Sequence, residues 1–167
     1  MKRTERVRAI GEIVPRLISR PWQQTPLPRA TIHASPPGTS AWPGITGIES
    51  RFWSNALPTA SASVQLDGWI VDAVASPIAY RWALSGVAVT VGVTPGDALA
   101  PAVRSQFRRL GDLDVGVYVV WSGVAHVYSP DYGLDLGTKP LGTVTIPERI
   151  GYHVAEIRSV LRTTVTG

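Results

Sequence analysis

The chain has 167 residues, of which 44% are hydrophobic and 17% are charged, a balance typical of a globular protein with room for one domain and an appendage. It contains no cysteine, which excludes a disulfide framework, a thiolate nucleophile and a cysteine-based metal site. The net charge of +4 comes entirely from residues 1–20, because the rest of the chain holds ten basic and ten acidic groups.

The first twenty residues predict a basic amphipathic helix. Val7, Ile10 and Val14 recur at helical spacing, and Pro15 should end or kink the helix. The segment lacks the apolar core of a secretory signal, and no apolar run of the chain is long enough to span a bilayer as a helix. Its helix is expected to contact an acidic partner, nucleic acid or a membrane surface, or alternatively to pack against its own domain with its charged face in solvent. The candidate contact residues are Lys2, Arg3, Arg6, Arg8, Arg16 and Arg20.

Residues 21–61 predict an extended, proline-rich arm. Eight of the fourteen prolines lie between residues 15 and 58, a composition that resists both helix and central strand. A disordered linker is usually poor in aromatic residues, whereas this stretch contains several. We therefore expect an ordered arm that lies across another surface, on this subunit or on a neighbouring one. Its candidate inter-subunit contacts are Trp22, Ile32, Trp42, Ile45, Phe52 and Trp53.

Residues 62–167 predict a β-domain. Alternating apolar residues indicate strands in 63–74 and 78–94, with a turn or bulge at Asp67-Gly68 in the first of them. In 78–94 the bulky residues change from even to odd positions. Because alternate residues of a strand face opposite sides, this parity change predicts a hairpin or bulge at Ser85-Gly86.

The rest of the domain predicts one helix and further strands. Asp97 is placed to cap a helix over about 97–110, whose apolar stripe includes Leu99, Val103 and Phe107. The later segments are predicted as a strand over 115–121, a turn at Ser122-Gly123, a strand over 124–128, a loop over 130–140 and a strand over 142–146. Residues 150–165 fit either helix or strand, and their β-branched content favours a strand. The predicted fold is mainly β, an antiparallel sandwich or barrel with one internal helix, preceded by the N-terminal helix and the arm.

The sequence predicts no catalytic residue, metal ligand or cofactor site. His33, His126 and His153 lack the spacing of a metal site. A set of Ser122, His126 and Asp131 can be drawn, but no strand–nucleophile–helix elbow surrounds the serine, so turn and sheet roles are favoured. Asp131 and Asp135 fall in a loop with fewer oxygen ligands than a calcium loop, which favours an ordinary surface turn.

The order of segments is a short basic helix, a proline-rich arm with aromatic residues and a charge-balanced β-domain. This organisation resembles small virion structural proteins, either head–tail and tail components of tailed phages or coat proteins with an N-terminal arm. The resemblance implies a non-enzymatic assembly subunit whose arm contacts copies of itself or other structural proteins, located in the virion, or in the cytoplasm if the protein is not viral. Two alternatives stay open: a nucleic-acid-associated protein that binds through its basic N-terminal segment, and a small β-barrel ligand-binding protein or hydrolase.

Overall fold

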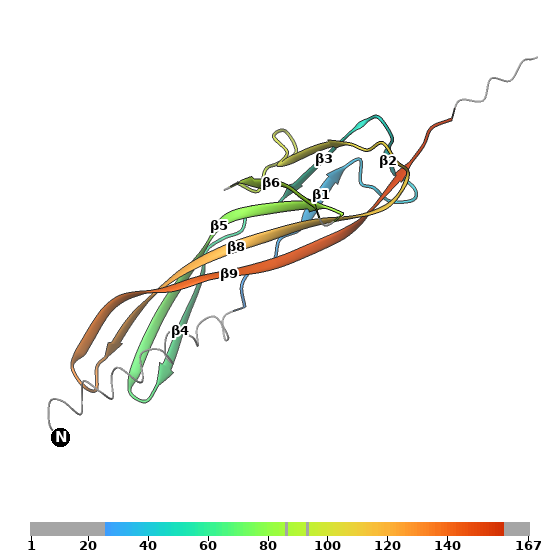
Figure 1. The fold of residues 1–167 in the computed structure, drawn as a ribbon. Helices are drawn as coiled ribbons and strands as arrows, with labels where there is room; N and C mark the ends of the chain where they lie inside the picture. Colours follow the sequence, from blue (N-terminus) through green and yellow to red (C-terminus); the bar gives the residue numbers. More distant parts are fainter. Residues whose placement is uncertain (1–25, 86, 93, 159–167) are drawn as a thin grey trace, which may run out of the picture. The chain divides into compact units, whose positions relative to one another are not determined.

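The computed structural model describes residues 26–85, 87–92 and 94–158, and these residues form strands and connecting loops without a helix (Figure 1). The mainly β class is therefore confirmed for this part of the chain, which also contains no helix able to cross a membrane. The predicted N-terminal helix lies outside the described residues. The strands are β1 (Ile32–Ser35), β2 (Gly44–Ile45), β3 (Glu49–Ser54), β4 (Ala60–Leu66), β5 (Trp69–Leu84), β6 (Val87–Gly92), β7 (Val103–Gln106), β8 (Gly111–Ser129) and β9 (Leu134–Ala155).

These strands form two sheets. The smaller sheet has the order β1-β3-β7, and the larger has the order β2-β9-β8-β5-β4, with β6 paired to β5. β2 runs parallel to β9, whereas β4 and β5 are antiparallel. The chain divides into two compact units: unit 1 holds the described residues of 1–30, 56–80 and 118–147, and unit 2 holds those of 31–55, 81–117 and 148–167.

Unit 1 contains the hairpin of β4 and β5, and its turn confirms the prediction at Asp67-Gly68. Both residues have positive φ, 50° and 77°, as a two-residue hairpin turn with the right-handed strand twist requires. The turn pairs Leu66 with Trp69. Figure 1 shows this turn at the same end of the sheet as the turn between β8 and β9. The buried cluster of unit 1 consists of Trp69, Val71, Ala73, Ala125 and Val127.

The hairpin predicted from the parity change in 78–94 is also confirmed. β5 ends at Leu84, Ser85 has a φ of 52°, and β6 then pairs with β5. The parity argument succeeded because alternate residues of a strand face opposite sides, so a change of parity in the sequence marks where the chain reverses.

The predicted turn at Ser122-Gly123 is wrong, because β8 runs without interruption through both residues. Odd-numbered residues are buried on both sides of this dipeptide, from Val115 to Val127, so the core-facing side never changes. A Ser-Gly pair without a parity change is compatible with a continuous strand. The predicted loop over 130–140 is also too long, since β9 begins at Leu134 and includes the strand predicted over 142–146.

The predicted internal helix over 97–110 is wrong as well. Asp97 does cap one turn, since its Oδ1 accepts hydrogen bonds from the backbone N–H groups two and three residues later, at 2.8 and 2.7 Å. The chain then passes through Pro101 into β7, which pairs antiparallel with β3. The residues of the expected apolar stripe are not buried together, because Leu99 is 92% exposed whereas Val103 is 3% exposed. In β7 the backbone N–H and C=O groups find their hydrogen-bond partners on β3. Helix propensity is a local preference and does not predict this pairing.

Part of the predicted arm forms strands within unit 2. β3 pairs with β1 on one side and with β7 on the other, and β2 pairs with β9 at residues 154 and 155. Burial along β3 alternates, with Ser50, Phe52 and Ser54 buried, which gives the sheet one face toward the core and one face outward. The strand interpretation of 150–165 is confirmed as far as Ala155, and residues 159–167 lie outside the described part.

Candidate interaction surfaces

Tyr152 organises the core of unit 2. Its ring is fully buried and lies 4.9 Å from the ring of Phe52 and 5.6 Å from that of Phe107, measured between centroids. Its hydroxyl lies 2.9 Å from Ser50 Oγ and 3.2 Å from the carbonyl oxygen of Pro36, and is placed to donate to either. Phe52 lies on β3 of the smaller sheet, Phe107 directly follows β7 of that sheet, and Tyr152 lies on β9 of the larger sheet. These aromatic contacts therefore join the two sheets within unit 2.

The loop over residues 38–42, here called the Trp42 loop, is held against Tyr152. A Cβ added at Gly38 would lie 2.0 Å from the Tyr152 ring, and one at Gly44 would lie 2.7 Å from it, so only glycine permits this approach. The loop is closed by hydrogen bonds from the Gly38 and Thr39 N–H groups to the Trp42 carbonyl, at 2.9 and 3.2 Å. Trp42 N–H donates to Thr39 Oγ1 at 3.1 Å. The loop is therefore fixed at both ends.

The Trp42 side chain points away from this anchored backbone. It is 72% exposed, although tryptophan is among the largest apolar side chains. A second apolar side chain, Ile48 in the connection between β2 and β3, is 53% exposed. The structure thus combines a fixed backbone with an aromatic side chain that the described residues leave mostly exposed.

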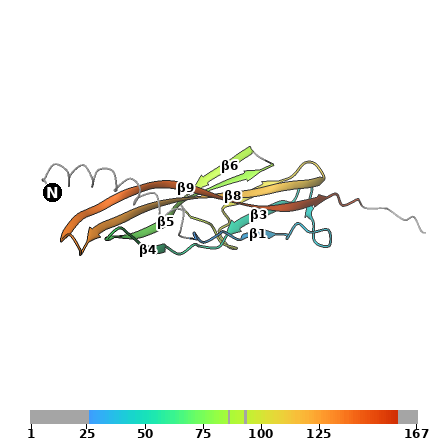
Figure 2. The same cartoon turned by 90° about the horizontal axis from the view of Figure 1, so that it is seen from below.

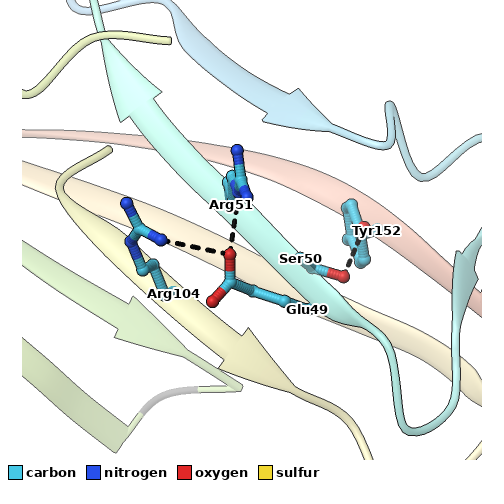
Figure 3. A network of polar contacts seen from close by, with 5 residues as sticks. All are labelled: Glu49, Ser50, Arg51, Arg104 and Tyr152. Atoms are coloured by element: carbon cyan, nitrogen blue, oxygen red, sulfur yellow. Dashed lines mark hydrogen bonds and ion pairs between the residues drawn. The ribbon is translucent and has the colours of Figure 1, made fainter. Parts of the chain in front are cut away.

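The outward face of β1, β3 and β7 is a second candidate surface. His33 stacks on Trp53 with ring centroids 5.7 Å apart. Figure 3 shows Glu49 between two arginines, with Arg51 Nε 2.8 Å and Arg104 Nη1 3.3 Å from the same oxygen, Glu49 Oε1. Glu49, Arg51 and Trp53 lie on β3, whereas Arg104 comes from β7 and His33 from β1, and β1 and β3 can be followed side by side in Figure 2.

The same contacts set the charge of Glu49. The hydrogen bond from Arg51, with the positive charge of Arg104 nearby, holds the pKa of Glu49 below its ordinary value. Glu49 therefore stays ionised and balances one of the two arginines. The face combines an aromatic pair with a partly neutralised arginine pair, an arrangement suited to a polar protein surface.

The predicted arm contacts differ in their exposure. Among the five that the structure describes, Trp42 is the most exposed, while Ile32, Ile45 and Trp53 are partly buried. Phe52 is fully buried by its own chain and is therefore not available to a neighbouring subunit. Trp22 and the six candidate basic residues lie outside the described residues: Lys2, Arg3, Arg6, Arg8, Arg16 and Arg20.

Unit 1 carries a polar cluster on the outward face of its sheet. His126 Nε2 lies 2.8 Å from Asp135 Oδ1, and the His126 ring stacks on Tyr128 with centroids 5.1 Å apart. A hydrogen bond to the Asp72 carboxylate raises the pKa of Tyr128. The histidine partner is thus Asp135, whereas the set considered from the sequence paired it with Asp131.

The Ser122, His126 and Asp131 set does not form a triad. Ser122 lies four residues before His126 on the continuous strand β8, a separation of about 13 Å along an extended chain. In the described part of the chain, no three His, Asp or Glu side chains gather as a metal site would require.

Burial of Tyr152 makes the stability of the protein sensitive to alkaline pH. Burial raises the pKa of Tyr152 above its ordinary value near 10, and burial does the same for Tyr80. The folded state therefore holds phenolic protons that the unfolded state releases. This contribution to stability is complete below pH 10 and is lost as the pH rises through the raised pKa.

We expect Tyr152→Phe to be less stable than the wild type by about 1–2 kcal/mol at pH 8, because Ser50 Oγ loses its partner. The difference should shrink above pH 10, where the wild type loses stability and the variant has no phenol at this position. Urea unfolding from pH 8 to 11 measures both trends. If the free energy of unfolding changed with pH in the same way for both proteins, the buried Tyr152 phenol would not be the cause of the alkaline loss of stability.

Comparison with family models, with curated proteins and with solved structures finds no match for this chain. Its function must therefore be inferred from the surfaces themselves.

Two of the residues that hold the Trp42 loop in place, Gly38 within the loop and Tyr152 beneath it, were not singled out by the sequence. Tyr152 falls in a segment for which helix and strand were both open, and Gly38 looked like one more turn residue in a proline-rich stretch. Their importance comes from the contact between them, which joins residues 114 positions apart. The placement of Gly38 and Gly44 on either side of Trp42 was the available signal.

Proposed function

We propose that this chain is a non-enzymatic assembly subunit that contacts a neighbouring copy through Trp42. The exposure of a tryptophan on an anchored loop is the observation that carries this proposal. Tryptophan is enriched among the residues that dominate binding energy at protein interfaces. Because the loop backbone is already fixed, association would order little more than the side chain.

The proposed assembly is of the virion type, either a head–tail or tail component of a phage or a coat protein. This part rests on the order of segments in the sequence and on the surfaces of unit 2. Copies of the same chain are the first expected partner, and other structural proteins of the particle are the second. A repeated assembly uses one contact surface many times, which suits a single anchored aromatic side chain on each subunit.

The nucleic-acid alternative ranks second. Its proposed contacts are the basic residues of 1–20, and the outward face of β3 and β7 adds Arg51 and Arg104. Both of these arginines share the Glu49 carboxylate, so they offer a phosphate less net charge than two unpaired arginines would. The ligand-binding barrel or hydrolase ranks third, since the one histidine of unit 1, His126, pairs with Asp135 on the outward, exposed face of the sheet.

We expect Trp42→Ala to weaken self-association by about 30-fold or more, the effect of removing an interface residue worth about 2 kcal/mol. The thermal unfolding midpoint should hardly change, because the side chain is mostly exposed. Sedimentation velocity over a concentration series measures the association of the full chain, and circular dichroism measures its unfolding.

Leu99→Ala is the matched control. Leu99 is an even more exposed apolar residue of unit 2, at 92%, and it lies outside the predicted arm. It should leave association unchanged. Equal weakening by the two variants, or a wild type that sediments only as a monomer, would overturn the proposal.

A further inference from the structure

β4 is the outermost strand of the larger sheet on the side of unit 1. Its inner edge pairs with β5 over all seven residues, and no described strand pairs with its outer edge (Figure 1). An unpaired strand edge presents a row of backbone N–H and C=O groups that fit another extended chain. The β4 edge is therefore a template for strand addition.

The other outer strand of unit 1 differs from β4 in the features that block such addition. The part of β9 in unit 1 contains Pro140 and Pro147, which lack an N–H donor, and Lys139, whose charge opposes burial. It also contains Gly137 and Gly142 with φ of 69° and 79°, a backbone typical of bulges that interrupt pairing.

β4 has none of these features. Its sequence, ASASVQL, contains no charged residue and no proline, and neither positive-φ glycine nor other positive-φ residue falls within Ala60–Leu66. Its outward side chains are small or neutral. One outer strand of unit 1 thus discourages pairing, and the other permits it.

We infer that β4 pairs with β4 of a second copy of this chain, antiparallel and about a two-fold axis at Ser63. Residues directly opposite each other in an antiparallel pair share one face of the sheet. A two-fold axis through a residue therefore places core-facing residues against core-facing residues. An axis midway between two residues would place Ser63 against Val64 and mix the two faces.

The side chains of β4 complement one another in this register. On the core-facing side, Ala62 lies opposite Val64 and Ala60 lies opposite Leu66, so a small residue meets a larger one in both pairs. On the outward side, Ser61 lies opposite Gln65 and Ser63 lies opposite itself. All seven residues find a partner, and no charges of like sign oppose each other. An axis at Ala62 or Val64 would leave part of the strand opposite the Asp67-Gly68 turn or Pro58.

Because the chain has no cysteine, single cysteines test this register directly. Ser63→Cys should form a disulfide-linked dimer under mild oxidation, since opposed residues have the Cα separation that a disulfide needs. Ser61→Cys alone should not, because its two copies would lie about 14 Å apart along the paired strands. We expect the Ser63→Cys cross-link to form at least about tenfold faster than that of Ser61→Cys.

A mixture supplies the matching positive control. Ser61→Cys mixed with Gln65→Cys should cross-link, although neither variant does so alone, because these positions are opposed in the inferred register. All three positions are exposed, so the variants should keep the wild-type unfolding midpoint. Equal cross-linking at positions 61, 63 and 65 would overturn the inferred register. The absence of a cross-link at position 63 would also overturn the inference, and this is the result expected if another chain segment or another protein occupies the β4 edge.

The β4 pairing stands independently of the proposed function, because it uses a different surface. Trp42→Ala introduced into the Ser63→Cys chain should leave the cross-link intact while preventing larger assemblies. If the double variant keeps the cross-link but no longer forms larger assemblies, the β4 pairing and the Trp42 contact are two separate contacts. A missing cross-link in a protein that still assembles would overturn the β4 pairing alone.

Discussion

Gly38→Ala should destabilise the protein by about 3 kcal/mol, a large effect for the addition of one methyl group. The new Cβ would lie 2.0 Å from Cδ2 of Tyr152, well inside van der Waals contact, and the Tyr152 ring is fully buried. The residue also has a φ of 73°, which costs an L-residue with a side chain about 1–2 kcal/mol. Urea unfolding at neutral pH measures the combined effect.

Gly47→Ala separates these two causes. Gly47 has a φ of 76°, nearly the same as Gly38, but a Cβ there would meet no atom within 4 Å. This control should cost only the backbone term of about 1–2 kcal/mol. Equal destabilisation by the two variants would show that the Trp42 loop does not press on Tyr152.

Phe52→Ala should destabilise the protein by about 3–5 kcal/mol, the usual cost of removing a large buried aromatic side chain. Phe52 is fully buried and contacts the rings of Tyr152 and Phe107. The variant would open a cavity between the two layers of unit 2. Urea unfolding of the full chain, with the free energy extrapolated to water, measures the loss.

The comparison with Trp42→Ala makes this a test of the predicted arm. Both aromatic residues belong to residues 21–61, yet Phe52→Ala should change stability and Trp42→Ala should change association. If Phe52→Ala left the free energy of unfolding unchanged and weakened association, Phe52 would belong to an inter-subunit contact and its packing in unit 2 would be incorrect.

The turns of the fold were predictable wherever the alternation of apolar residues carried information. At Ser85 the bulky residues change parity, and the chain reverses there. At Ser122-Gly123 the dipeptide is the same but the parity does not change, and β8 continues. A serine–glycine pair permits a turn without requiring one, so the core-facing pattern decides.

The segment over 97–110 could not be assigned correctly from local preference. An acidic cap, apolar residues at helical spacing and a following glycine all favour a helix. Val103 also alternates with polar neighbours, and its burial depends on pairing with β3, about fifty residues earlier in the chain. This contact between distant segments outweighs the local signals.

The candidate site was predictable only in part, for a similar reason. Composition placed Trp42, Phe52 and Trp53 in one group of apolar arm residues. Which of them is buried depends on the strand register, which places Phe52 toward the core and Trp53 on the opposite face. The alternation of Ser50, Phe52 and Ser54 contained this information, but the surrounding prolines and glycines obscured it.

The contact between the Trp42 loop and Tyr152 also constrains when the protein can finish folding. Gly44 pairs with Val154, and the ring of Tyr152 fills the space beside Gly38 and Gly44. During synthesis β2 and the Trp42 loop must therefore wait for a partner more than a hundred residues later in the chain. Pairing across such a sequence separation is slow, and Phe52 lacks the Tyr152 ring that packs on it until then. Release of residues 148–155 from the ribosome is the step that allows unit 2 to close.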